Sequence, residues 1–418
     1  MNYRSRSVES SIQALCAYFP VVAVLGARQV GKTTLVRQIF GSEYETVVFD
    51  PVQDVEQARE EPDLFLANHP GKLFLDEVQY APELLASIKR RVDRSGEPGQ
   101  FILSGSQNLA VIKNIAESLA GRVAIVELHG LSYKESMGRP ADDFLQRWVS
   151  GDITVSNAEG LISGGVRERA EPPPWFDVVF RGGFPGTLDL PETVLGRFFS
   201  SYQQTYVERD IRSVADIGNL QLFSRFFRLL GALSGTEINA AQLGRDLDID
   251  RRTVLAWKSV LESTYQWTEV PAFSRNPAKR IAAKSKGVFS DTGLMCNLQR
   301  ISSPEMIAGH PLQGRIIETW VMNEIFRICS AWNTAPGFYH YRSVGGAEVD
   351  LILEMNGKLF PIEIKSRSHP SGRDIGGIKS FRETFPHENI ADGLLICAAP
   401  RAFRISENVL ALPWFQLS

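Results

Sequence analysis

Hydrophobic residues in the first 140 positions gather in four short runs, and segments with helical spacing separate these runs. Each run is continuous rather than alternating, which is typical of strands that are covered on both faces. The runs occupy positions 21–25, 46–49, 72–75 and 101–103. Strands and helices that alternate in this way predict a parallel α/β sheet built through right-handed crossovers.

A helical pattern replaces the strand pattern in the middle of the chain. Residues 197–233 carry aromatic side chains at helical spacing, which indicates helices that face a core. Asn239 and Asp250 can each cap a short helix, and a tight turn joins the two helices. Strand-like segments at 265–273 and 279–289 follow. This order predicts a helix-turn-helix with a wing.

Two alternating segments near the C-terminus flank Asn356-Gly357, the strongest short signal for a β-hairpin. A two-residue turn pairs Met355 with Lys358, and the register then continues outward along both strands. One face of the predicted hairpin is apolar. Its pairs are Val349 with Ile364, Leu351 with Ile362, and Leu353 with Phe360.

The opposite face of the hairpin carries charges. The register places Asp350 opposite Glu363 and Glu348 opposite Lys365. Directly opposed carboxylates repel each other in a bare sheet, so Asp350 and Glu363 need a cation between them. Mg²⁺ or Mn²⁺ supplies one, because hard cations take oxygen ligands. A solvated ladder of ion pairs, with a salt bridge from Glu348 to Lys365, is the alternative.

This Asp…Glu-x-Lys face resembles the active site of the PD-(D/E)xK nuclease superfamily. The resemblance implies that Asp350 and Glu363 hold the metal ion, and that Lys365 orients the water or stabilises charge on the phosphate. Glu318 lies on an upstream amphipathic helix and matches the helix acid that often completes such sites. Whether a domain of this kind still cleaves nucleic acid stays undecided.

Composition limits what the chain can be. Its 418 residues are 44% hydrophobic and 22% charged, which is typical of a soluble protein with two or three domains. No apolar run approaches the roughly 18 residues of a membrane span, and the first residues lack the apolar segment of a signal peptide. The four cysteines lie far apart, so we expect free thiols in a reducing cytoplasm.

The net charge of −3 gives the chain no overall attraction to nucleic acid. Positions 241–290 differ, because they contain nine Lys or Arg residues against five Asp or Glu residues. This local positive excess predicts a surface that contacts DNA phosphates. The alternative is that the winged helix serves only as a packing module.

The clearest chemistry follows the first apolar run. Positions 26–33 match the phosphate-binding pattern G-x-x-x-x-G-K-T, with a strand before it and a helix after it. Backbone N–H groups of such a loop surround the β-phosphate, Lys32 reaches the β- and γ-phosphates, and the Thr33 hydroxyl binds Mg²⁺. ATP is the expected ligand. Its expected contacts are Gly26, Gln29, Val30, Gly31, Lys32, Thr33 and Thr34.

Acidic and polar residues follow two later strands. Asp76 and Glu77 come at the carboxyl end of a buried strand, where open α/β sheets place their ligands. We expect Asp76 to hold Mg²⁺ and Glu77 to polarise the attacking water, so the sequence predicts an ATPase. Ser106 or Ser104 is a candidate sensor of the γ-phosphate, with a simple turn as the alternative. Arg122 is a candidate arginine finger or sensor, with an ordinary surface arginine as the alternative.

Eight motifs in one order resemble a broad prokaryotic family of ATP-binding proteins, which join an AAA-type ATPase to a C-terminal domain of unknown function. They are the phosphate loop, Leu-Asp-Glu-Val-Gln at 75–79, Leu-Ser-Gly-Ser at 103–106, Leu-Ala-Gly-Arg at 119–122, Gly-Gly-Phe-Pro at 182–185, Tyr-Val-Glu-Arg-Asp at 206–210, Asp-Thr-Gly-Leu at 291–294, and the hairpin pair Glu-Val-Asp and Glu-Ile-Lys. The resemblance implies an AAA-like parallel α/β core, a winged helix and a restriction-endonuclease-like α/β domain. It implies no substrate.

We therefore divide the chain into four parts. They are a P-loop AAA-type ATPase domain at 1–140, a Gly- and Pro-rich connector at 141–196, a helical and winged-helix domain at 197–300, and a nuclease-like domain at 301–418. The leading hypothesis is an ATP-driven machine that acts on DNA. The alternative is a nucleotide-dependent switch or scaffold whose nuclease-like domain is inactive. A signalling ATPase without a nucleic-acid partner, and assembly into a homo-oligomer, both stay open.

Overall fold

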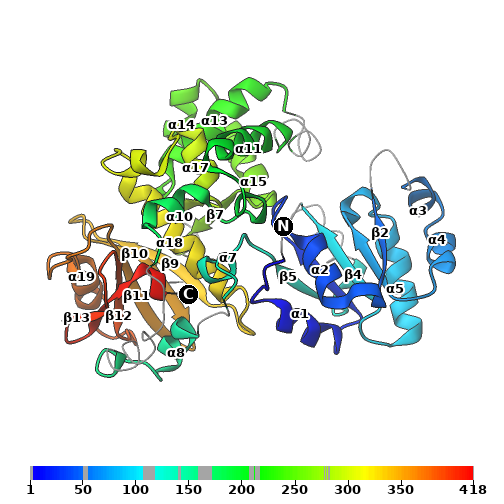
Figure 1. The fold of residues 1–418 in the computed structure, drawn as a ribbon, viewed down its shortest axis with the longest axis horizontal. Coiled ribbons are helices and arrows are strands. Elements are labelled where there is room, and N and C mark those ends of the chain that lie inside the picture. The colour runs from blue at the N-terminus through cyan, green and yellow to red at the C-terminus, as the bar shows by residue number, and fades with distance from the viewer. Residues whose placement is uncertain are drawn as a thin grey trace.

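The computed structural model describes residues 3–49, 55–106, 118–139, 143–158, 172–206, 211, 217–276, 278, 280 and 283–417. Figure 1 shows a blue and cyan sheet with its helices, a green and yellow helical region, and an orange and red sheet. Among the helices that the structure describes, none is long and apolar enough to cross a bilayer.

The N-terminal sheet has five parallel strands in the spatial order β2-β3-β4-β1-β5. The strands are β1 Val21–Leu25, β2 Glu45–Val48, β3 Leu73–Asp76, β4 Phe101–Gly105 and β5 Val123–Glu127. The helices are α1 Glu9–Cys16, α2 Lys32–Phe40, α3 Glu56–Glu60, α4 Pro62–Asn68 and α5 Leu84–Ser95. The parallel α/β sheet expected from the apolar runs is therefore confirmed.

Continuous apolar runs form the central strands because both faces of this sheet are covered. In β1, Val22 and Val24 pack in the core that also contains residues of α1 and α2. Val21, Ala23 and Leu25 point the other way, into a core that contains residues of α4 and α5. Since all strands are parallel, the loops that follow β1, β3 and β4 leave the same edge of the sheet.

The middle of the chain is mainly helical. Its helices are α10 Trp175–Arg181, α11 Glu192–Thr205, α13 Leu220–Leu233, α14 Ala240–Leu247, α15 Arg251–Ser263 and α17 Thr292–Leu298. Three short strands, β6 Thr236–Glu237, β7 Trp267–Val270 and β8 Lys286–Phe289, form an antiparallel sheet in the order β6-β8-β7. The two predicted caps are confirmed, since Asn239 accepts from Ala241 N–H and Asp250 accepts from Thr253 N–H. The series from α13 to β8 has the element order of a winged helix.

The C-terminal part is a mixed six-stranded sheet in the order β13-β14-β12-β11-β10-β9. Its strands are β9 Gly337–Arg342, β10 Glu348–Met355, β11 Lys358–Ile364, β12 Gly393–Cys397, β13 Phe403–Ser406 and β14 Val409–Pro413. The long helix α18, Gln313–Cys329, contributes to the core on one face, and α19, Gly376–Thr384, contributes to the core on the other. The predicted hairpin register is confirmed from the pair Met355–Lys358 to the pair Leu351–Ile362.

Two details of this hairpin correct the sequence-based expectation. Val349 and Ile364 do not share a face, because Val349 packs in the core on the α19 side and Ile364 in the core on the α18 side. The pairing of β10 with β9 shifts register between Val349 and Ile352, and such a bulge changes which face a side chain reaches. A proline within a strand predicts an edge strand or a bulge, but β11, which contains Pro361, is central in the sheet and pairs with β10 without a shift in register.

Segments that are distant in sequence hold the wing and part of the predicted connector against the C-terminal sheet. Phe273, between β7 and β8, stacks edge-on against Phe381 and Phe385, and its N–H donates to the His340 carbonyl of β9. Helix α8, Phe144–Ser150, lies beside the C-terminal sheet in Figure 1. The described part of the segment that the sequence predicts as a wing is thus part of an interface and not a free projection.

Candidate functional site

The phosphate loop connects β1 to α2 at the carboxyl edge of the N-terminal sheet. Gly31 precedes α2 with a φ of 96°, a left-handed conformation that favours glycine. A Cβ atom on Gly26 would clash with the Leu128 carbonyl oxygen. Lys32 is buried, and its Nζ donates to the Gly26 and Ala27 carbonyls at 3.0 Å each. The lysine therefore lies folded over the loop, within the space that a phosphate group enters.

Thr33 and Asp76 meet beside this loop. The Thr33 hydroxyl donates to Asp76 Oδ2 at 2.6 Å, and the Ser104 hydroxyl donates to Asp76 Oδ1. Asp76 is 3% exposed, so its carboxylate is held by neighbouring groups rather than by solvent. A hydroxyl and a carboxylate are oxygen ligands of the kind that Mg²⁺ prefers. The donor set at Thr33 and Asp76 thus fits the ion that the sequence predicts.

Glu77 lies next to this pair and has its own partners. Its backbone is left-handed, with a φ of 58°, and its Oε2 accepts from Gln79 Nε2 at 2.5 Å and from the Ser106 hydroxyl at 3.1 Å. The two candidate sensor serines therefore differ, because Ser104 holds Asp76 while Ser106 holds Glu77. Gln79, which the sequence analysis did not single out, has a buried Oε1 without a hydrogen-bond partner among the described residues.

A helix of the middle region closes over this group. Glu77, with Arg28 and Gln29 of the loop, lines a cavity of about 180 Å³. The opposite wall is the end of α11, through Tyr202, Thr205 and Tyr206. The phosphate loop is therefore enclosed between the N-terminal sheet and the helical region.

A second cavity of about 330 Å³ begins at the start of α2. It contains Gly31 and Thr34 of the loop, and its other walls come from three separate segments. Those wall residues are Tyr3, Arg4, Arg6, Leu35, Leu131, Pro185, Leu188 and Asp189. Pro185 belongs to the Gly-Gly-Phe-Pro motif, so that motif contributes to a wall beside the loop.

Arg6 contacts the phosphate loop, although no sequence pattern predicted this contact. Its Nη1 donates to the Val30 carbonyl of the phosphate loop at 3.0 Å, and its Nη2 donates to the His129 carbonyl at 2.7 Å. Its Nε forms a buried ion pair of 3.1 Å with Glu135. Burial opposes the charge of Glu135, but Arg6 and the N–H groups of Ser7 and Ser132 outweigh it and lower the pKa of this carboxyl.

Arg122 lies away from the phosphate loop of its own chain. It precedes β5, its carbonyl accepts from Val21 N–H at the beginning of β1, and its side chain is paired with Asp93. The loop follows the other end of β1, so Arg122 and the chain's own phosphate loop lie at opposite edges of the sheet. The physical reason is the parallel pairing of β5 with β1, which places their first residues together.

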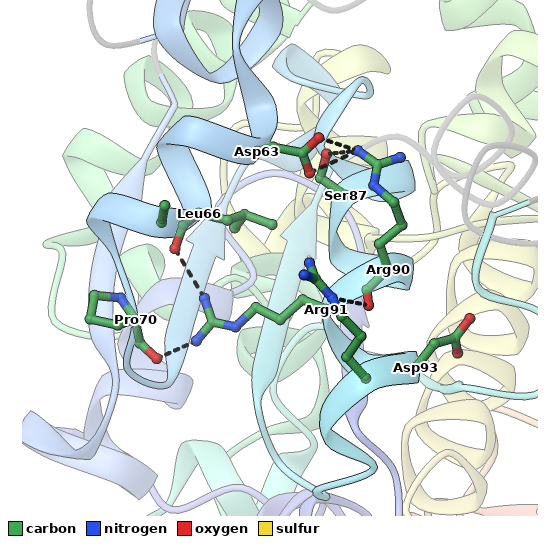
Figure 2. A pocket seen from close by; sticks show the side chains of 9 residues that line it. Asp63, Leu66, Pro70, Ser87, Arg90, Arg91 and Asp93 are labelled. Carbon is green, nitrogen blue, oxygen red and sulfur yellow. Dashed lines mark hydrogen bonds and ion pairs between the residues drawn. The ribbon is translucent and has the colours of Figure 1, made fainter.

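A cavity of about 920 Å³ lies on the same side as Arg122, between α4 and α5. Figure 2 shows that its arginines already have partners within the protein. Arg90 binds the Asp63 carboxylate and the Ser87 hydroxyl, and Arg91 donates to the Leu66 and Pro70 carbonyls. These contacts give a structural reason for the arginines, and we assign no ligand to this cavity.

The C-terminal part brings together the residues that the nuclease resemblance singled out. Asp350 is 8% and Glu363 5% exposed, and Glu363 Oε1 accepts from Lys365 Nζ at 2.6 Å. Lys365 Nζ lies 4.0 Å from Asp350 Oδ2, which also accepts from Ile364 N–H at 2.9 Å. Glu318, from α18, joins them through a lysine that the sequence analysis did not identify.

That lysine is Lys286, the first residue of β8. Its side chain is 1% exposed, and its Nζ lies 2.6 Å from Glu318 Oε1, 2.8 Å from Glu348 Oε1 and 3.6 Å from Asp350 Oδ1. The salt bridge of Glu348 that the alternative predicted with Lys365 is therefore made with Lys286 instead. We call the six residues the acid–lysine cluster: Lys286, Glu318, Glu348, Asp350, Glu363 and Lys365.

Charges in this cluster are coupled. Burial and the Asp350 charge raise the pKa of Glu318 to about 8, and the same causes raise the pKa of Glu363 well above its usual value. Burial opposes the charge of Lys286, but Glu318, Asp350 and Glu348 outweigh it and raise its pKa. Four carboxyl groups face two lysines, so the fully ionised cluster would carry a net charge of −2, and the raised pKa values of Glu318 and Glu363 reflect this excess of negative charge.

The carboxylates of this cluster do not fit a metal ion as they are arranged. No group of three or more His, Cys, Asp or Glu residues in the described ranges is disposed to hold one. The expected metal ligands Glu318, Asp350 and Glu363 are directed at Lys286 and Lys365 instead.

Family comparisons match the chain in three stretches. Residues 18–137 match a family described as an AAA domain. Residues 174–305 match a domain of unknown function, DUF8612, and residues 313–417 match another, DUF4143. The three matched stretches correspond to the blue and cyan part, the green and yellow part, and the orange and red part of Figure 1.

Whole-chain relatives and solved structures add context. The chain is 27% identical over 400 residues to the uncharacterized protein Rv2008c of Mycobacterium tuberculosis and to the uncharacterized protein Mb2031c of Mycobacterium bovis, which covers 95% of this chain and 81% of each relative. The Walker-type ATPase paby2304 of Pyrococcus abyssi has 16% identity and a TM-score of 0.42, over 72% of this chain and 99% of that one. The RuvB Holliday junction branch migration motor of Thermotoga maritima has 15% identity and a TM-score of 0.29, over 67% of this chain and 95% of that one. Scores this low support no argument about this chain.

The phosphate loop and the parallel sheet agree with the matched family. The chain is similar to Rv2008c over most of its length, and its residues 18–137 match an AAA domain, followed by matches to two domains of unknown function.

Proposed function

We propose that this protein binds ATP with Mg²⁺, hydrolyses it, and passes its nucleotide state to the helical region as a switch. The observation that carries the proposal is the meeting of Thr33, Asp76 and Glu77 at one edge of the sheet, beside a complete phosphate loop. Phosphoryl transfer needs mainly positioning and charge stabilisation, and these groups are of the types that supply both.

Each residue has a role in this proposal. Lys32 exchanges its bonds to the loop carbonyls for the β- and γ-phosphates, while the Thr33 hydroxyl and Asp76 hold Mg²⁺. Glu77 polarises the attacking water as a general base, and Ser106 sets its orientation. Backbone N–H groups of Gly26, Gln29, Val30, Gly31 and Thr34 surround the phosphates.

The cavity of about 330 Å³ suits the base and ribose of the nucleotide. It opens beside Gly31 and Thr34, where a nucleotide held by the loop would continue. Leu131, Pro185 and Leu188 offer apolar contact to the base, and Asp189 offers a polar group. Arg6 supports this wall and the loop together, because it bonds to Val30 and to the segment that contains His129.

Hydrogen bonds of Tyr202 and Tyr206, which line the cavity of about 180 Å³, could transmit the nucleotide state to the winged helix. Tyr206 shares a hydrogen bond of 2.6 Å with Thr264, and the Tyr202 hydroxyl accepts from Gln266 Nε2 at 2.9 Å. Tyr202 and Tyr206 line the cavity beside Glu77, while Thr264 and Gln266 follow α15 of the winged helix. A shift of α11 upon nucleotide binding would therefore reach the winged helix directly.

A DNA-acting machine remains the second candidate, and the charges favour the switch over it. The cations counted in the sequence as a DNA surface include several that bind carboxylates. They are Lys258 with Glu269, Arg275 with Glu388, Arg280 with Glu354, and Lys286 in the acid–lysine cluster. Arg251 and Arg252 at the start of α15 are exposed, which is the observation that keeps DNA binding as a candidate.

ATP turnover tests the proposal. Lys32→Ala should abolish it through lost phosphate contacts, and Glu77→Gln should abolish it while ATP still binds. Normal phosphate release by both variants would exclude hydrolysis at this loop. Steeply salt-dependent binding to duplex DNA that disappears in the Arg251→Ala, Arg252→Ala double variant would favour the second candidate. Mg²⁺- or Mn²⁺-dependent DNA cleavage that disappears in Asp350→Ala would restore the nuclease hypothesis.

A further inference from the structure

The acid–lysine cluster contains a cation supplied by another part of the chain. Glu318, Glu348, Asp350, Glu363 and Lys365 all belong to the C-terminal part, whereas Lys286 comes from β8 of the three-stranded sheet in the middle of the chain. We propose that the Lys286 ammonium is the resident cation of this cluster, and that docking of β8 and binding of a divalent cation exclude each other. The cluster would then accept Mg²⁺ or Mn²⁺ only when Lys286 has left it.

The distances make the two occupants incompatible. Nζ is surrounded by oxygens of Glu318, Glu348 and Asp350 at 2.6, 2.8 and 3.6 Å. A Mg²⁺ ion lies about 2.1 Å from each oxygen ligand, so an ion that bridged two of these three oxygens would lie against the Nζ ammonium and be repelled by its charge. Lys286 must therefore move before the ion can bind there.

One carboxylate oxygen in the cluster is available for a further ligand. Glu363 Oε2 is buried and has no hydrogen-bond partner among the described residues, although Oε1 of the same group binds Lys365. An unpartnered buried carboxylate oxygen is costly, and a metal ion is one of the groups that can satisfy it. The contacts of Lys286 leave this Glu363 oxygen unused, so Glu363 can still bind a cation through it.

Charge favours a metal ion once the lysine is removed. With all groups ionised, four carboxylates and two lysines sum to −2, and removal of Lys286 changes this to −3. An uncompensated buried charge destabilises a folded protein by several kcal/mol, so the cluster without Lys286 must take up protons or a cation. A divalent ion supplies more charge than the lysine that it replaces.

The Lys286 side chain is 1% exposed, so it has no open path to solvent while β8 stays in place. Its backbone pairs with Val270 of β7 and with Glu237 of β6, so the strand is fixed on both sides. The neighbouring wing is held to the C-terminal sheet through Arg275 with Glu388 and Arg280 with Glu354. Withdrawal of Lys286 thus requires that this part of the helical region separates from the C-terminal sheet, and cation binding would report that separation.

Mn²⁺ binding to the nucleotide-free, full-length protein tests the inference, with free Mn²⁺ measured by electron paramagnetic resonance. Lys286→Met should gain one Mn²⁺ site. Its affinity for Mn²⁺ should be at least about tenfold higher than that of any site that the same residues form in the unmodified protein. Lys286→Arg, which keeps the positive charge, should gain none. Lys284→Met, which alters an exposed lysine two positions away, is the matched control. Adding Asp350→Asn to Lys286→Met should remove the gained site.

Each outcome of the Mn²⁺ measurement either supports or overturns the proposal. An Asp350-dependent site of equal affinity in the unmodified protein would overturn the proposal, and so would a folded Lys286→Met protein without a new site. If Lys286→Met fails to fold in the absence of metal, Mn²⁺ should restore its cooperative thermal transition, and failure to do so would also overturn it. The readout does not use ATP, so a failure here is distinct from a failure of the proposed hydrolysis at Lys32.

Discussion

The Thr33 hydroxyl donates a hydrogen bond of 2.6 Å to Asp76, although the two residues lie 43 positions apart in the sequence. Thr33 lies in the first turn of α2, and Asp76 is the last residue of β3. Only β4 lies between β3 and β1 in the parallel sheet, so both residues reach the same edge of the sheet. This contact joins the two halves of the proposed Mg²⁺ site.

The Asp76→Asn substitution should lower ATP turnover by at least about a hundredfold. A metal ion contributes several kcal/mol to transition-state stabilisation, and each 1.36 kcal/mol corresponds to a factor of ten in rate. Phosphate release measured over a range of Mg²⁺ concentrations should show partial recovery at high Mg²⁺. Asp93→Asn, which alters an exposed carboxylate paired with Arg122, is the control and should turn over normally. An unchanged Mg²⁺ dependence in Asp76→Asn would contradict the assignment.

The bond from Arg6 to the Val30 carbonyl leads to a second prediction. Arg6→Ala should destabilise the protein by roughly 3–5 kcal/mol, because it leaves the buried Glu135 charge without its partner. Arg6→Lys keeps the charge but not the forked contacts to Val30 and His129. It should therefore weaken ATP binding with a smaller loss of stability. Denaturant unfolding and ATP titration measure the two effects, and normal ATP affinity in Arg6→Lys would show that the loop does not depend on this arginine.

Features set by neighbouring residues could be predicted from the sequence. The phosphate loop, the caps at Asn239 and Asp250, and the Asn356-Gly357 turn all depend on groups a few positions apart. The buried strands could be predicted as well, since a strand covered on both faces must be apolar along its length. These features were enough to predict both the parallel sheet and the phosphate-binding loop.

Several contacts between distant residues could not be predicted. Lys286 meets Glu318 and Asp350, which lie 32 and 64 positions away, and Arg6 meets Glu135 at a separation of 129 positions. A hairpin register alone assigns Glu348 to Lys365, because it contains no information on a third strand that brings a competing lysine. The same limit explains the wing, where a count of cations treats Arg275 as free although it binds Glu388.

The bond between Tyr206 and Thr264 gives a third prediction, which concerns the switch. Tyr206→Phe removes only the hydroxyl group and should cost about 1 kcal/mol of stability. If nucleotide binding reaches the winged helix through this contact, an ATP analogue should change amide hydrogen exchange in α15 of the unmodified protein and change it less in Tyr206→Phe. Tyr18→Phe is the matched control, since Tyr18 is 82% exposed. Equal responses in both variants would rule out this route.

The fourth prediction concerns pH and follows from Glu318. Its pKa is raised from the usual 4.5 to about 8 by burial and by Asp350, so the folded protein retains a proton that the unfolded chain releases. The contribution of this group to stability is therefore complete below about pH 4.5 and is lost as the pH rises toward about 8. Glu318→Gln cannot titrate, so the stability of the unmodified protein relative to this variant should fall between about pH 5 and about pH 8.

Urea unfolding of both proteins across this pH range measures that difference directly. Glu407→Gln, which alters an exposed residue, should show no such trend relative to the unmodified protein. A difference that grew with pH would mean that Glu318 is ionised in the folded state and that Lys286 alone balances its charge. In that case the excess negative charge would have to be balanced at another carboxyl group of the cluster, because its four carboxyl groups still outnumber its two lysines.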